Sequence, residues 1–174
     1  MTATSAILFF LVSQLNDFLF YNEDFEFTVG VGWIYLPAGM RLLCTLLFGG
    51  AGAVGIFLTA LYVSFFTYFP DDPMRALAGS IASALAPYLT YLFAQKAYGL
   101  KTSLVNLNAQ RLFLLTMLFS VAGPSILNLW LLLIGRDLGM DIFVMMTGDF
   151  VGSMILIYTF KLILSFVPVK SPRQ

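Results

Sequence analysis

Two charged residues lie inside long apolar stretches of this chain, and they are the residues best placed to carry chemistry. Arg41 follows Trp33 by eight residues, and Asp149 follows Asp141 by eight residues. A charge inside a membrane helix costs at least a few kcal/mol, so such a residue usually faces other helices or water. Each of these two charges therefore needs a counter-charge, a route to the headgroups, or a change of protonation.

Equal depth makes an ion pair between Arg41 and Asp149 geometrically possible. If Trp33 and Asp141 both mark the outer surface of a membrane, a rise of about 1.5 Å per residue puts both charges roughly 12 Å below that surface. A partner of opposite charge offsets the cost of burying each of them. Two alternatives stay open: Arg41 could extend to the headgroups, or Asp149 could be a protonated packing residue.

Asn128 is the third polar residue inside an apolar stretch, and a membrane asparagine usually bonds a neighbouring helix. Together, Arg41, Asp149 and Asn128 are the candidate residues for binding a ligand or partner, or for a buried ion pair. Histidine is absent and there is one cysteine, Cys44, so an internal disulfide is excluded. The chain has no nucleotide-binding loop and no nucleophile beside a base. We therefore expect a non-enzymatic protein without a metal site, and the sequence identifies no cofactor.

The elements that position these residues are predicted to be membrane helices. Of the 174 residues, 60% are hydrophobic and only 10% are charged, whereas a soluble domain carries about 25% charged residues. Backbone groups cannot stay unpaired in lipid, and the solid apolar runs lack the alternation of a β-barrel. The predicted fold class is all-α, a polytopic integral membrane helical bundle of about six transmembrane helices. Residues 1–174 form a single transmembrane domain.

The second of the six expected spans is short or broken, because Pro37 and Gly39 lie near its start. The six stretches are approximately 5–20, 34–48, 53–69, 76–93, 112–134 and 141–167. Lys and Arg in short loops mark the cytoplasmic side, and they gather in residues 95–111 and in the tail, 168–174. This predicts a multi-pass protein of a bacterial-type cytoplasmic (inner) membrane, with both termini in the cytoplasm. A second stretch that does not cross would place the N-terminus outside.

Two motifs resemble those of a known family. Trp33-Ile-Tyr-Leu-Pro37-Ala38-Gly39, followed by an apolar run and a glycine-rich turn, is similar to the opening of MASE-type membrane-associated sensor domains. Gly148-Asp-Phe-Val-Gly152 is similar to the Gly-Asp-x-x-Gly motif of that family. The resemblance covers a sensor-like core of about residues 30–166. It implies an integral membrane input module of the kind usually fused to a cytoplasmic histidine kinase or cyclic-nucleotide signalling domain.

Because the chain ends within eight residues of its last expected span, we expect it to act through a separate protein. The first interpretation is a sensor-like module that binds a small ligand or a membrane partner between its helices. The second is a structural or accessory subunit of a larger membrane complex, and the third is a solute-binding component of a transporter. The expected partners are membrane lipids and another protein or a larger membrane complex. Nucleic acid is not expected, because the net charge is zero.

Overall fold

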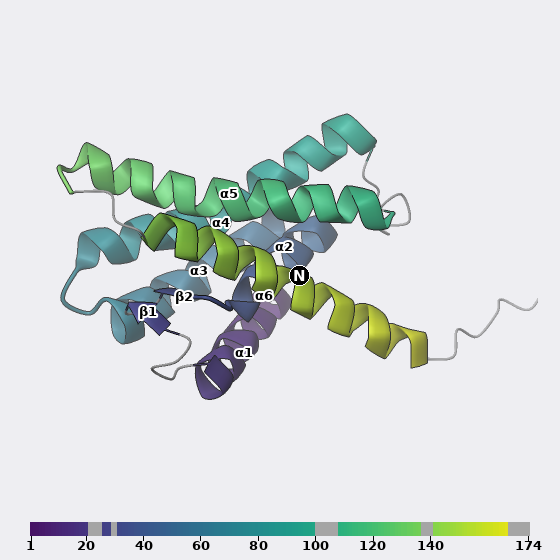
Figure 1. Cartoon of the computed structure of the whole chain (residues 1–174), viewed down its shortest axis with the longest axis horizontal. Helices are drawn as coiled ribbons and strands as arrows, with labels where there is room; N and C mark the ends of the chain where they lie inside the picture. The colour runs from purple at the N-terminus through teal and green to yellow at the C-terminus, as the bar shows by residue number, and fades with distance from the viewer. Residues whose placement is uncertain (21–25, 29–30, 100–107, 137–140, 167–174) are drawn as a thin grey trace, which may run out of the picture.

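The computed structural model describes residues 1–20, 26–28, 31–99, 108–136 and 141–166, and most of them are helical (Figure 1). The described helices are α1 (Thr2–Phe20), α2 (Leu36–Phe48), α3 (Gly50–Val63), α4 (Pro73–Tyr98), α5 (Ala109–Leu133) and α6 (Asp141–Phe166). A π-helical segment, η1 (Ser64–Tyr68), continues α3, and a small antiparallel ribbon of β1 (Glu26–Thr28) and β2 (Val31–Gly32) precedes α2. The all-α class is confirmed, whereas no sequence pattern indicated the ribbon.

Five helical stretches are long and apolar enough to cross a membrane, so the chain is a multi-pass membrane protein. They are Thr2–Phe20, Gly50–Tyr68, Pro73–Tyr98, Ala109–Leu133 and Asp141–Ile163. Helix α2 has only 13 residues and is about 20 Å long, whereas the hydrocarbon core of a bilayer is about 30 Å thick. The prediction of a short second helix is confirmed. The bundle therefore has five long helices and one that is too short to span alone.

Helix α2 lies at the centre of the bundle, and each of the other five helices contacts it. Ten of its 13 residues are buried. One side of α2 shares a core with α4, α5 and α6, built around Leu42, Leu46 and Phe119. Another side shares a core with α1, α3 and α6, built around Met40 and Ile56. Arg41 is the charged residue in the middle of this helix.

Successive helices run in alternating directions. The hydroxyl of Thr59 donates to the carbonyl of Ala6, and the hydroxyl of Tyr68 donates to Asp17, so α1 and α3 run the same way. Helix α2 reverses into α3 at Gly49, whose positive φ of 57° suits glycine. The start of α1 and the end of α6 consequently point to the same end of the bundle. The tail, 168–174, lies outside the described residues.

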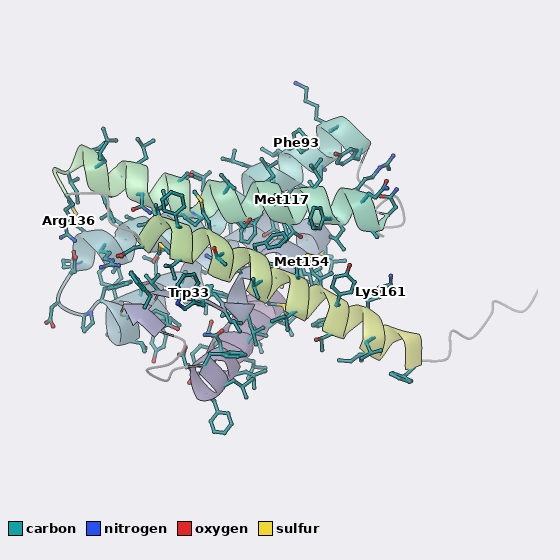
Figure 2. All side chains as sticks on the ribbon, viewed as in Figure 1. Trp33, Phe93, Met117, Arg136, Met154 and Lys161 are labelled. Atoms are coloured by element: carbon teal, nitrogen blue, oxygen red, sulfur yellow. The ribbon has the colours of Figure 1, made fainter. Side chains whose placement is uncertain are left out.

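The two ends of the bundle are called here the Arg136 end and the Lys161 end, after residues labelled in Figure 2. At the Arg136 end, Arg136 donates to Asp72 with both terminal nitrogens, and the Nη2–Oδ1 distance is 3.0 Å. Asp72 also caps α4 by accepting from the backbone N–H of Arg75. These contacts tie the start of α4 to the end of α5. The guanidinium of Arg136 holds the pKa of the Asp72 carboxyl below its usual range.

This tie predicts a pH dependence with a definite sign. Because the pKa of Asp72 is lowered in the folded state, its stabilising effect is complete above the unfolded value of about 3.9 and is lost as the pH falls through the folded pKa. The stability difference between the natural protein and Asp72→Asn should thus be constant from about pH 8 to pH 5. It should shrink only below about pH 4, as thermal unfolding in detergent would show. A difference that already falls between pH 7 and pH 5 would contradict this assignment.

Candidate functional site

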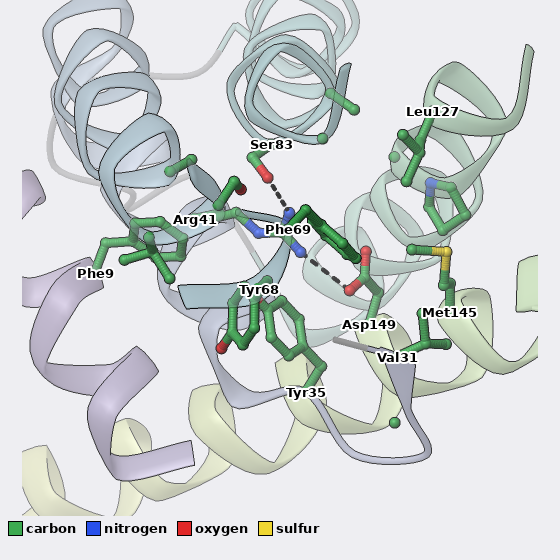
Figure 3. Close-up of a pocket in the computed structure, with 18 residues that line it drawn as sticks. Phe9, Val31, Tyr35, Arg41, Tyr68, Phe69, Ser83, Leu127, Met145 and Asp149 are labelled. Atoms are coloured by element: carbon green, nitrogen blue, oxygen red, sulfur yellow. Dashed lines mark hydrogen bonds and ion pairs between the residues drawn. The ribbon is translucent and has the colours of Figure 1, made fainter. Parts of the chain in front are cut away.

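Arg41 and Asp149 form the ion pair that their sequence positions predicted. Arg41 Nη2 lies 3.0 Å from Asp149 Oδ1, and both residues are only 7% exposed. Arg41 comes from the middle of the central helix α2, and Asp149 comes from the first half of α6 (Figure 3). Since Arg41 is buried against Asp149, its side chain does not extend to the headgroups. The pair joins two segments that are 108 residues apart in the chain.

The rest of the Arg41 guanidinium is surrounded by a hydroxyl and two aromatic rings. Nη1 donates to the hydroxyl of Ser83 on α4 at 2.9 Å. The ring centroids of Tyr35 and Phe119 lie 5.1 Å and 5.5 Å from Cζ, at cation–π distance. Nε is buried and has no hydrogen-bond acceptor among the residues that the structure describes. Arg41 thus links α2 to α4, α5 and α6, and only two of its five N–H groups have acceptors among the described residues.

A cavity of about 90 Å³ lies against this ion pair. Arg41, Asp149, Ser83 and Tyr35 line it, and Figure 3 shows these side chains around the space. Residues of β2 and η1 form its wall toward the Arg136 end. A bound water takes about 30 Å³, so the cavity has room for roughly three waters or one very small molecule. The ion pair therefore borders a space inside the bundle whose lining is mostly apolar, with the polar side chains gathered around the pair.

The two motifs that resemble a sensor family pack directly against each other. A Cβ atom on Gly148 would lie 2.2 Å from the carbonyl oxygen of Gly32, and one on Gly152 would lie 2.1 Å from that of Tyr35. The backbone N–H of Tyr35 donates to the carbonyl of Gly148 at 3.1 Å. Gly39 likewise packs against the backbone of Ser153. Without side chains at these positions, α6 can approach α2 closely enough to put Asp149 beside Arg41.

Other residues singled out from the sequence lie elsewhere or serve packing. Asn128 is buried, but its amide donates to the carbonyl of Pro124 in its own helix at 2.9 Å, and it does not line the cavity. It therefore bonds neither a neighbouring helix nor the ion pair through this donor. Trp33 is 47% exposed and meets the ring of Phe27 edge-on. Pro37 and Ala38 are buried in the first turn of α2.

Sequence reasoning missed several residues that build the site. Ser83 gave no signal, because a serine in a membrane helix normally bonds its own backbone. Asn16 of α1 accepts from the backbone N–H of Leu36 at 2.9 Å and so caps α2 from another helix. Gly79 was visible only as one of many small residues in its helix. An ideal Cβ on Gly79 would meet no atom within 4 Å, and the residue lines the cavity.

Comparisons of this chain with protein families, with curated proteins and with solved structures find no match.

Proposed function

We propose that this protein is a non-enzymatic membrane input module that binds a small ligand between its helices and acts through a separate protein. The observation that carries the proposal is the buried Arg41–Asp149 pair at the wall of a cavity. Ionisable residues inside a membrane bundle are costly and usually functional. A pair that served stability alone could be replaced by apolar side chains of similar volume, often without loss. Its position at a cavity gives it a role that apolar side chains cannot fill.

The path from the cavity to a partner runs along α6. Asp149 lies in the first half of this helix, and Leu156 and Ile157 are the last of its residues in the buried core. Beyond them, α6 continues toward the Lys161 end and away from α5 (Figure 1). Its exposed apolar side chains there include Tyr158, Leu162, Ile163 and Phe166. A ligand that shifts Asp149 would shift the same rigid helix that presents this surface to a partner.

The same proposal includes a location and an orientation. A bacterial-type cytoplasmic membrane with both termini in the cytoplasm puts the Lys161 end on the inner side, where a signalling partner would lie. The support for this orientation is the distribution of Lys and Arg in the short loops. Within this frame the cavity lies closer to the outer surface, and a ligand would arrive from the Arg136 end.

A cavity-filling substitution tests ligand binding without touching the ion pair. Gly79→Leu adds a side chain on α4 where no atom lies within 4 Å, at the wall of the cavity. Ala84→Leu is the matched control, because Ala84 lies on another face of the same helix, in an apolar groove against α3. At least one fraction of a polar metabolite extract should raise the midpoint temperature of thermal unfolding of the purified protein. This increase should persist in Ala84→Leu and vanish in Gly79→Leu.

If the extract raises the unfolding temperature of Gly79→Leu as much as that of the natural protein, the ligand binds elsewhere and the proposal is overturned. The proposal is also overturned if no fraction raises the unfolding temperature of the natural protein.

The second candidate function is an accessory subunit of a larger membrane complex, which the exposed apolar end of α6 favours. Solubilisation in mild detergent followed by mass spectrometry separates the two. Stoichiometric co-purification with a large complex, together with no ligand response of the isolated protein, would support the accessory subunit. A free, monodisperse protein that responds to a ligand would support the input module.

A further inference from the structure

Arg41 and Asp149 keep hydrogen-bonding capacity beyond their ion pair, and both residues line the cavity. Each terminal nitrogen of Arg41 carries two N–H groups; one on Nη1 is bonded to Ser83 and one on Nη2 to Asp149. Asp149 Oδ2 receives no hydrogen bond from any residue that the structure describes. Oδ2 faces Gly123 of α5, whose ideal Cβ would lie 3.4 Å from it. A guest that accepts from a terminal N–H of Arg41 and donates to Oδ2 would pair with both side chains.

The charges around the cavity favour a guest without net charge. Arg41 and Asp149 are the charged residues among the described residues that line it, and their charges cancel. The other titratable groups in the lining are Tyr35 before α2 and Tyr68 of η1, while α4 and α5 contribute none. The hydroxyl of Tyr68 is bonded to Asp17 of α1. An anion would lie against the carboxylate of Asp149, and a cation would lie against the guanidinium of Arg41, so each would meet a like charge.

The size of the cavity favours a small guest. About 90 Å³ corresponds to roughly three waters, which is the room that a molecule of a few heavy atoms needs. The side-chain hydroxyl of Ser83 on α4 and that of Ser64 on η1 lie in the same lining and add further polar contacts. The space exists partly because Gly79 and Gly123 carry no side chains.

We infer that this cavity binds a small uncharged molecule that both donates and accepts hydrogen bonds, the class of primary amides, ureas and un-ionised short carboxylic acids. The inference rests on the proposed function and names the ligand class of that site. The carbonyl oxygen of such a molecule accepts from a terminal N–H of Arg41, and its N–H or O–H donates to Asp149 Oδ2. The ion pair stays intact in this complex, so no charge is left unpaired inside the bundle.

Three probes of the same shape but different charge test the inference. Acetamide is neutral, acetate is an anion and acetamidinium is a cation, and each has four heavy atoms. Ligand-detected NMR with the full chain in lipid nanodiscs at pH 7 measures their relative affinities, with empty nanodiscs as the control for partitioning. Acetamide should bind at least tenfold more tightly than either ion. Gly79→Leu should abolish its binding, and Ala84→Leu should leave it unchanged.

Substitution of either charged residue should change which of the three probes binds most tightly. In Asp149→Asn the surviving guanidinium should favour acetate, and in Arg41→Gln the surviving carboxylate should favour acetamidinium. If these two variants do not fold, the ranking of the three probes and the Gly79→Leu comparison still decide the matter. Binding of an ion as tight as that of acetamide, and sensitive to Gly79→Leu, overturns the neutral ligand class but leaves the proposed function standing. If no probe binds, or if Gly79→Leu does not change the binding, the inference is overturned. If, in addition, no fraction of the metabolite extract raises the unfolding temperature, the proposed function is overturned as well.

Discussion

Removal of either member of the central ion pair should destabilise the folded protein by about 3–5 kcal/mol, because it leaves the other charge buried and unpaired. The substitutions are Arg41→Met and Asp149→Leu, which roughly keep the length or volume of the side chain. Both residues are only 7% exposed, so the low-dielectric interior of the bundle surrounds most of each side chain. Arg41→Met would also remove the bond to Ser83. Reversible unfolding in mixed micelles measures the decrease in the free energy of unfolding.

The matched control is Arg136→Met, which removes an arginine from the exposed ion pair with Asp72. The side chain of Arg136 is 44% exposed, and exposed pairs contribute little because water and salt screen them. We expect the free energy of unfolding of this variant to be close to that of the natural protein. Equal effects of Arg41→Met and Arg136→Met would show that Arg41 is not buried beside Asp149.

The addition of one methyl group at Gly152 should destabilise the protein by about 1–3 kcal/mol or more, because it overpacks the contact between α6 and the start of α2. The new Cβ would lie 2.1 Å from the carbonyl oxygen of Tyr35 and 2.8 Å from the backbone nitrogen of Leu36. These are backbone atoms, so no rotamer change can move them away. The helices must separate, and the Arg41–Asp149 distance must grow with them. Thermal unfolding of Gly152→Ala in detergent measures the effect.

Two further alanine variants make this prediction specific. Gly148→Ala should behave like Gly152→Ala, because its Cβ would lie 2.2 Å from the carbonyl oxygen of Gly32. Gly79→Ala should be neutral or slightly stabilising, since no atom lies within 4 Å and alanine favours the helix by about 1 kcal/mol. If all three variants unfold at the same temperature, α6 does not pack against the start of α2 through these glycines.

The ion pair could be predicted from the sequence, because the free-energy cost of a charge in an apolar stretch is visible from the neighbouring residues alone. Arg41 and Asp149 are both expensive in an apolar stretch, and each follows an interfacial residue by the same number of positions. The helical rise per residue predicted equal depth without knowledge of the packing, although the structure is helical only from Leu36 in the segment from Trp33 to Arg41. The same local reasoning predicted that α2 is short or broken, because Pro37 and Gly39 lie near its start.

The surroundings of the pair could not be predicted, because they depend on which helix faces which. Nothing in the sequence indicates that the shortest helix is the central one, since its apolar composition would equally suit an edge position. Ser83 meets Arg41 through a rotation of α4 that no local pattern specifies. The expectation that Asn128 bonds a neighbouring helix was wrong for its amide donor, which bonds Pro124 in the same helix.

The motif residues show both the use and the limit of pattern reasoning. Gly148, Gly152 and Gly39 were singled out by their likeness to a sensor family, and that membership stays a prediction. Their steric role is visible only in the structure, where backbone from residues 32–36 occupies the space that side chains on α6 would need. Such contacts join distant segments, so a single sequence cannot indicate them.

The most direct measurement of the central claim is a double-mutant cycle of Arg41→Met and Asp149→Leu. Replacement of both members of a buried pair by apolar side chains is often nearly neutral, although each single replacement is costly. The double variant should therefore be more stable than either single variant, with a coupling energy above about 2 kcal/mol. Single losses that simply add, within about 0.5 kcal/mol, would show that the two charges do not meet inside the bundle.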